Sequence, residues 1–143
     1  YTAPRERRMK GMIGRLRGVL VSADDGIALV ECGGVGYEVV LPDRILAGLA
    51  PNEETTLHIR HVVREDAQIL YGFAETFERR MFDRLLGVSG CGPKAAMGLL
   101  SAMEAEDLAF AIASGDARLL TRAPGIGLRT AERIVVDLKE KMA

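Results

Sequence analysis

Residue types that often build functional sites are scarce in this chain of 143 residues, which has no tryptophan, three tyrosines and four phenylalanines. Barrels that bind single-stranded nucleic acid stack bases on exposed aromatic side chains, so this scarcity argues against that class. The two cysteines, Cys32 and Cys91, have neither metal-site nor disulfide spacing. The two histidines, His58 and His61, lie at odd spacing on one predicted strand. They should point to opposite faces and cannot share a metal ion.

The chain also lacks any apolar run near the roughly 20 residues of a membrane helix, and it has no secretory signal pattern. We therefore expect a cytoplasmic protein without a membrane partner. There is no phosphate-binding P-loop, so we expect no ATP hydrolysis. No nucleophile or cluster of acids stands out, and we predict no catalytic residues, no metal and no cofactor.

The net charge is only −1, which argues against a broad positive surface for nucleic acid. Residues 12–73 contain five basic and nine acidic residues, whereas residues 74–143 contain ten of each. Any binding to DNA would therefore depend on local geometry, with backbone amides and a few placed cations.

The spacing of the apolar residues changes along the chain, from a strand-like period before Ala74 to a helical period after it. Residues 12–73 show strand-like patterns separated by Asp24-Asp25-Gly26, Gly33-Gly34 and a polar tip at 64–67. The expected elements are five antiparallel strands at 12–22, 27–32, 35–41, 55–63 and 68–73, with a short helical or irregular piece at 42–49. Five short strands in about sixty residues are typical of a small closed barrel. An OB-type barrel is the leading candidate, and a five-stranded SH3-like barrel is the alternative.

From Ala74 onward the apolar residues follow a helical period. Helices are predicted at 76–86, 92–101, 105–114, 116–121 and 127–141, with Asp116 as the N-cap of the fourth. Phe77 and Phe82 are expected to be buried on the first. The predicted fold class is thus α+β and multidomain, with a barrel domain at 12–73 and an all-α domain at 74–143. The basic segment at 1–11 is interpreted as a tag remnant or extension.

The all-α segment contains one short motif twice. Residues 88–96, VSGCGPKAA, return 35 positions later as residues 123–131, APGIGLRTA, and a leucine pair precedes each copy. A Gly-apolar-Gly hairpin between two helices leaves backbone N–H groups free at the start of the second helix. Together with the helix dipole they form a site for an anion such as a phosphate. Two copies at matched spacing predict two grips on a DNA backbone, without reading of bases.

Alone, a Gly-X-Gly hairpin could be no more than a tight turn. The duplication, and a cation two residues after the second glycine in each copy, favour helix-hairpin-helix motifs of non-sequence-specific DNA binding. In the hairpins, Cys91 is interpreted as a small apolar residue in the place that Ile126 fills. Arg133 either adds a cation to the face of Arg129 or pairs with Asp137. The predicted phosphate-binding residues are Gly90, Cys91, Gly92, Lys94, Gly125, Ile126, Gly127, Arg129, Thr130 and Arg133.

Four further stretches accompany both hairpins, and these are residues 12–18 (MIGRLRG), 33–39 (GGVGYEV), 62–66 (VVRED) and 70–73 (LYGF). The sequence resembles the RuvA family in both hairpins and in these four stretches. Members of that family are the Holliday-junction-binding subunits of the bacterial branch-migration machinery. The resemblance covers the chain from Met12 to Ala143. It implies an OB-fold barrel followed by two helix-hairpin-helix motifs, and a homotetramer, or an octamer of two tetramers, on four-way junction DNA.

The resemblance also assigns Glu65 and Asp66 as an acidic pin that projects toward the junction centre. Without it, a solvated hairpin tip would be the better interpretation. It implies coupling to the RuvB motor through a third domain that this sequence lacks, and RuvC resolvase as a further candidate partner. The chain departs from the family at Leu128, where a cation is usual. A helix-hairpin-helix DNA repair enzyme and a single-strand-binding OB protein remain the alternative functions.

Overall fold

The computed structural model describes residues 11–142, so the segment predicted as a tag remnant lies outside the described residues except for Gly11. Five strands precede most of the helices. The elements are β1 (Arg15–Asp24), β2 (Ile27–Cys32), β3 (Val35–Val40), α2 (Asp43–Ala47), β4 (Glu54–Val63), β5 (Gln68–Phe73), α3 (Thr76–Leu86), α4 (Pro93–Ala102), α5 (Ala105–Ala113), α6 (Ala117–Leu120) and α7 (Leu128–Met142). Every predicted element is present, and no end differs from its predicted position by more than three residues.

The strands form a closed barrel in the order β1-β2-β3-β5-β4, with β4 pairing back onto β1. This confirms the expected OB-type barrel. The expectation that all strands are antiparallel is wrong for one pair, because β3 and β5 run parallel through Val39 opposite Leu70 and Val40 opposite Tyr71. The segment between these strands crosses the end of the barrel through α2 and returns along β4, so β5 enters beside β3 in the same direction.

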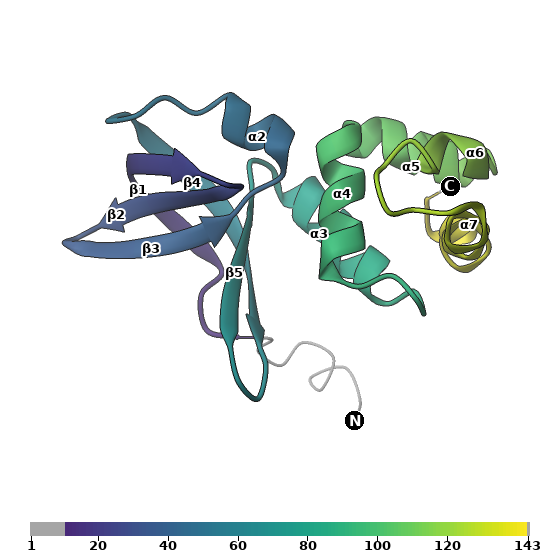
Figure 1. Cartoon of the computed structure of the whole chain (residues 1–143), viewed down its shortest axis with the longest axis horizontal. Coiled ribbons are helices and arrows are strands. Elements are labelled where there is room, and N and C mark those ends of the chain that lie inside the picture. The colour runs from purple at the N-terminus through teal and green to yellow at the C-terminus, as the bar shows by residue number, and fades with distance from the viewer. Residues whose placement is uncertain (1–10, 143) are drawn as a thin grey trace.

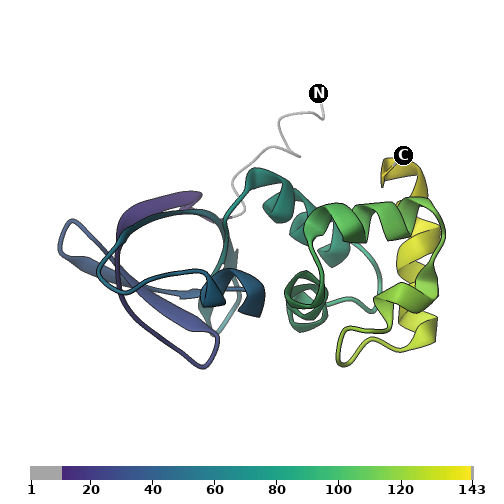
Figure 2. The same cartoon turned by 90° about the horizontal axis from the view of Figure 1, so that it is seen from above.

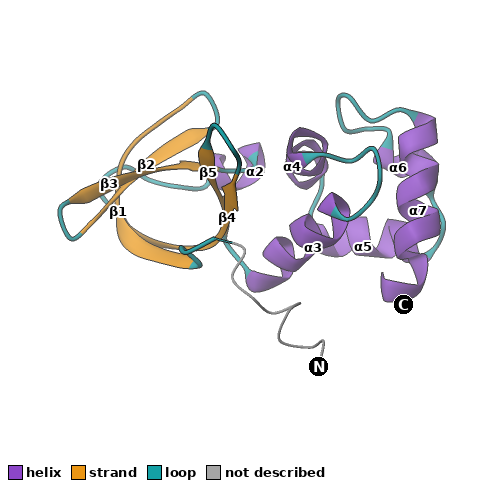
Figure 3. Ribbon diagram, turned by 90° about the horizontal axis from the view of Figure 1, so that it is seen from below, coloured by secondary structure: helices purple, strands orange, loops and turns teal. Residues whose placement is uncertain are grey.

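Buried residues alternate with more exposed ones along β2, β4 and the first half of β1, and the buried side chains fill the barrel. β5 instead ends in three successive buried residues, Tyr71, Gly72 and Phe73. Leu20, Val30, Val39, Leu57 and Ile59 are all at most 1% exposed. Figure 3 shows the strands on one side of the molecule and the helices on the other, with α2 alone among the helices on the barrel side. The alternation in sequence therefore predicts the inner face of the barrel correctly.

The helices pack around a second set of buried residues that includes Leu85, Leu99, Leu108, Ile112 and Ile134, each fully buried. Asp116 caps α6 as predicted, since its carboxylate accepts a hydrogen bond of 3.2 Å from the amide of Leu119. The expectation that Phe77 is buried is only partly met. Its ring is half-buried and lies under the guanidinium of Arg80, because it sits near the solvent edge of α3.

The barrel and the helices are in direct contact. α3 follows β5 after two residues and lies between the barrel and the other helices (Figure 1). In the view from above, the blue helix α2 lies beside the green helix α4 (Figure 2), and the amide of Asp43 donates a 2.8 Å hydrogen bond to Ser101 Oγ. The β4–β5 tip and the α3–α4 loop both lie toward the lower edge of Figure 1.

Candidate nucleic-acid interface

The two copies of the repeated motif form hairpins with the same internal hydrogen bonds. In the first, the amides of Val88, Cys91 and Ala96 donate to carbonyls three or four residues earlier, at 3.0 Å each. In the second, residues 35 positions later make the matching bonds. The amides of Ala123, Ile126 and Ala131 donate at 3.2, 3.1 and 3.0 Å. The duplication in sequence is therefore a duplication in structure.

Each hairpin uses its two glycines differently. The first glycine adopts a left-handed conformation, with φ of 88° at Gly90 and 84° at Gly125. Other residues rarely adopt this region, so the chain reversal requires glycine there. The second glycine does not: Gly92 has φ −89° as the N-cap of α4. A side chain built on Gly92 or Gly127 would meet no atom within 4 Å. These positions leave the helix N-terminus open to an approaching group.

The middle residue of each hairpin anchors it. Cys91 and Ile126 are 4% and 5% exposed, and their amides are already bonded to Val88 and Ala123. Burial raises the pKa of the Cys91 thiol, which therefore stays neutral at physiological pH. Both residues hold the hairpin closed rather than pointing toward a ligand.

The first amides of α4 and α7 face no protein acceptor within residues 11–142. In the first hairpin these are the N–H groups of Lys94 and Ala95, since Pro93 has none. In the second they belong to Leu128, Arg129 and Thr130. Such amides, at the positive end of a helix dipole, are suited to bind an anion.

Cationic side chains lie on the same two helices as these amides. The side chains of Lys94, Arg129 and Arg133 are exposed. Arg133 makes no ion pair with Asp137 in the described part of the chain, so of its two predicted roles the geometry favours the free cation. Arg129 and Arg133 line a shallow depression on α7 together with Glu132, which reduces the local positive charge.

The second hairpin lies against α4, the helix that follows the first hairpin. A cleft of about 550 Å³ runs between the barrel and the helices, and both Lys94 and Pro124 line it. Gly98 of α4 faces the carbonyl of Pro124 so closely that an added Cβ would lie 3.5 Å from it.

The predicted acidic pin forms the end of the β4–β5 hairpin. Arg64 and Ala67 close the tip through a 2.8 Å backbone hydrogen bond, with Glu65 and Asp66 exposed between them. Neither carboxylate makes an ion pair in residues 11–142. Burial raises the pKa of the Tyr71 hydroxyl, and the positive charge of Arg64 offsets part of that rise.

His61 lies just below this tip and is buried. Its Nδ1 accepts hydrogen bonds from the amides of Met12 and Ile13, at 3.0 and 3.3 Å, and its Nε2 lies 2.8 Å from Gln68 Oε1. Both ring nitrogens are thus used to fasten the start of the chain to β4 and β5. His61 therefore has a structural role. Across residues 11–142, no group of three or more His, Cys, Asp or Glu side chains is placed to hold a metal ion.

Sequence reasoning missed the residues that connect the barrel to the helices, namely Arg44, Arg60, Arg79 and Asp83. Arg44 lies 3.4 Å from Glu78, which is 7% exposed, and 3.0 Å from Glu104. No local signal in the sequence marks these pairs, since each joins segments at least 20 residues apart. No helix in the described part is long and apolar enough to cross a membrane.

Comparisons with known proteins divide the chain in the same way. The family described as the RuvA N terminal domain matches residues 12–72, and the SAM-like helix-hairpin-helix tandem matches residues 82–140. Proteins named Holliday junction branch migration complex subunit RuvA are similar along 92% of this chain. They include those of Marinobacter nauticus, Corynebacterium efficiens and Acidobacterium capsulatum, at 43%, 48% and 46% identity. The chain spans 63%, 65% and 67% of their respective lengths, about two thirds of each.

Proposed function

This chain belongs to the RuvA family, and from that premise we propose that it binds four-way DNA junctions by their shape rather than by their sequence. The observation that carries the proposal is the pair of matching hairpins, each with unpartnered helix N-terminal amides, beside a barrel that ends in an unpaired acidic tip. The hairpins supply attraction to phosphates, and the tip supplies repulsion.

In this proposal the hairpins bind the sugar-phosphate backbone of the junction arms. The open positions at Gly92 and Gly127 let a phosphate oxygen approach the amides of the following helix. Lys94, Arg129 and Arg133 add charge, and Thr130 adds a hydroxyl at the start of α7. Gly90, Cys91, Gly125 and Ile126 act by shaping the hairpins. None of these contacts distinguishes one base from another.

The tip makes the binding selective. At a separation of 4 Å, two like charges repel by about 1 kcal/mol in bulk water and by about 4 kcal/mol near a protein surface. The carboxylates of Glu65 and Asp66 would therefore oppose the close packing of strands over the tip, especially where protein and DNA exclude water. A continuous duplex would have to place phosphates there, whereas an open junction leaves its centre free.

The repulsion is strongest if several tips meet at one point. We propose that four copies surround the junction with their tips at the centre, as one tetramer or as two that sandwich the DNA. The remaining third of the relatives' length lies beyond the match, and there we place the domain that binds the RuvB motor. RuvC resolvase is a further candidate partner. The protein itself would hold the DNA in the cytoplasm while the motor moves it, in recombination and repair.

The alternative functions have less support. A repair enzyme needs metal-binding acids or a pocket for a flipped base, and the described residues hold no group of three or more His, Cys, Asp or Glu side chains placed for a metal ion. A single-strand binder needs exposed aromatic side chains on its barrel. Of the three aromatic residues in the described barrel, Tyr71 and Phe73 are 7% and 0% exposed and Tyr37 is half-buried.

The test compares a four-way junction with a linear duplex of the same length and composition. The double variant Glu65→Gln/Asp66→Asn should keep or tighten duplex binding while its preference for the junction falls, measured by titration in gel-shift assays. A matched control is Glu53→Gln/Glu54→Gln, which removes the same charge at the opposite end of β4. An unaltered affinity ratio in the tip variant, or an equal change in the control, would refute the role of the tip.

A further inference from the structure

The strands that carry the acidic tip are docked onto α3, the first helix of the first hairpin motif. Arg60 of β4 reaches across to Asp83 of α3 with two parallel hydrogen bonds. Arg60 Nε donates to Asp83 Oδ1 at 2.6 Å, and the second bond joins Arg60 Nη2 to Asp83 Oδ2. The side chains are 23% and 29% exposed, so water only partly screens the pair. This two-point geometry fixes orientation as well as distance.

Two further contacts hold the same strands against α3. The ring of Phe82 lies 5.0 Å from that of Tyr71 and 5.2 Å from that of Phe73, both on β5. Arg79 donates to the carbonyl of Gly14 at 2.8 Å and to that of Ile59 at 3.4 Å. The base of the tip hairpin therefore meets α3 through one ion pair, one aromatic cluster and one bridging arginine.

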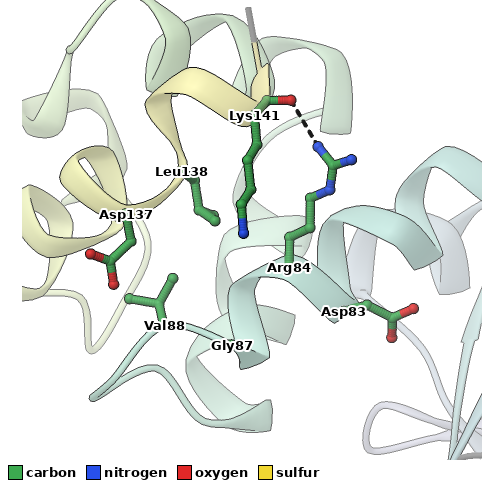
Figure 4. A pocket seen from close by; sticks show the side chains of 7 residues that line it. All are labelled: Asp83, Arg84, Gly87, Val88, Asp137, Leu138 and Lys141. Atoms are coloured by element: carbon green, nitrogen blue, oxygen red, sulfur yellow. Dashed lines mark hydrogen bonds between the residues drawn. The ribbon is translucent and has the colours of Figure 1, made fainter. Parts of the chain in front are cut away.

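The neighbour of Asp83 points the other way. Arg84 donates a 2.9 Å hydrogen bond to the carbonyl of Lys141, near the end of α7. Figure 4 shows the two successive side chains leaving α3 in different directions, with Arg84 reaching to α7 and Asp83 directed away from it. Since α7 begins at the second hairpin, α3 is bonded both to the strands bearing the tip and to the helix of the second grip.

We infer that Arg60 and Asp83 are positioning residues for junction selectivity: their pair fixes the acidic tip relative to the two phosphate-binding hairpins. This inference rests on the proposed function. Repulsion at the junction centre depends on where the tip stands when the hairpins hold the arms. If the barrel could tilt on α3, the tip could move away from the strands and a plain duplex would be tolerated. Duplex binding itself needs only the hairpins.

The Asp83→Asn variant distinguishes a positioning role of the pair from a general effect of net charge on DNA binding. Asp83→Asn removes a negative charge, so long-range attraction to DNA predicts equal or tighter binding to every substrate. Loss of positioning predicts instead that the ratio of junction to duplex affinity falls. A purely structural role, in which part of the protein unfolds, would weaken both affinities together and leave the ratio unchanged.

The experiment titrates wild type, Asp83→Asn and Arg60→Lys with junction and duplex at one salt concentration, after circular dichroism confirms folding. The matched control is Glu54→Gln, whose partner Arg17 forms an exposed pair 3.9 Å away within the barrel. We expect the affinity ratio to fall at least threefold in Asp83→Asn, less in Arg60→Lys, which keeps the charge, and not at all in Glu54→Gln. The exchanged pair Arg60→Asp/Asp83→Arg should recover part of the ratio.

Each outcome is decisive. A fall in the ratio confined to the Arg60 and Asp83 variants supports positioning. An unchanged ratio in folded Asp83→Asn overturns it, and if that variant fails to fold, an unchanged ratio in Arg60→Lys does the same. If the ratio of junction to duplex affinity falls in the tip variant of Glu65 and Asp66 but not in the Arg60 and Asp83 variants, the proposed function stands and the positioning inference fails. Absence of any junction preference in wild type refutes both.

Discussion

The two hairpins share one backbone conformation but connect different helices. Their three matching backbone bonds agree within about 0.2 Å, and their first glycines differ by 4° in φ. Yet the first hairpin connects helices of 11 and 10 residues, and the second connects helices of 4 and 15 residues. The local motif therefore determines the hairpin, and helix length does not.

What differs between them is the connection to the rest of the molecule. The first hairpin follows α3, which is bonded directly to the barrel through Asp83. The second follows α6, whose helix contacts are with α5 and α7. The first helix position also differs, since Pro93 lacks the N–H that Leu128 offers. One hairpin is tied to the barrel that carries the acidic tip, and the other offers an additional amide.

The largest expected effect comes from the glycines that reverse the chain. Gly90→Val and Gly125→Val should each destabilise the fold by about 1–2 kcal/mol or more, because a β-branched residue is strained at positive φ. Urea denaturation would measure the loss, and junction binding should weaken with it. Equal losses would confirm that the hairpins are equivalent, and a larger loss at Gly90 would show the influence of the barrel.

The matched controls are Gly92→Ala and Gly127→Ala, where a Cβ meets nothing within 4 Å. Stability should change little, while phosphate binding weakens because the methyl group occupies the approach to the amides. A destabilisation as large as that of the valine variants would contradict the distinct roles of the two glycines.

A smaller effect is expected from the cations. Lys94→Ala and Arg129→Ala should each weaken binding to junction and duplex alike. Each should also reduce the slope of log K against log salt by about one phosphate contact. Titrations at several salt concentrations would measure both. Leu128→Lys, which adds a cation at the first position of α7, should steepen the slope. If the cation variants of one hairpin leave the slope unchanged, that hairpin is not part of the interface.

The smallest effect concerns the anchoring residues. Because burial raises the pKa of Cys91 above its ordinary 9.0, the neutral thiol favours folding below that pH. The contribution is lost as pH rises toward the folded-state pKa. Iodoacetamide at pH 8 should therefore modify half-buried Cys32 before Cys91, as mass spectrometry would show. Ile126→Cys, 5% exposed in the matching hairpin, should be as slow as Cys91; rapid labelling at either position would show an open hairpin.

Much of this protein could be predicted from sequence because its signals are local. Alternation of apolar residues predicted the strands, and the first glycine of each hairpin indicated a position that only glycine adopts easily. The parallel pairing of β3 with β5 could not be predicted in this way. A strand has the same alternation whichever neighbour it meets, so the period does not encode the direction of its partner. The half-buried position of Phe77 was missed for a related reason, since helical period predicts a face but not its edge.

The sequence by itself determined the two hairpins, their cations and the acidic tip, because each depends on residues within about ten positions of one another. Only the tertiary structure decided how they are held together. The pair of Arg60 with Asp83 spans 23 positions, and that of Arg44 with Glu78 spans 34. Two charged residues so far apart meet only once the barrel closes and α3 docks against it. Until the chain is folded, nothing distinguishes them from the other charges on its surface.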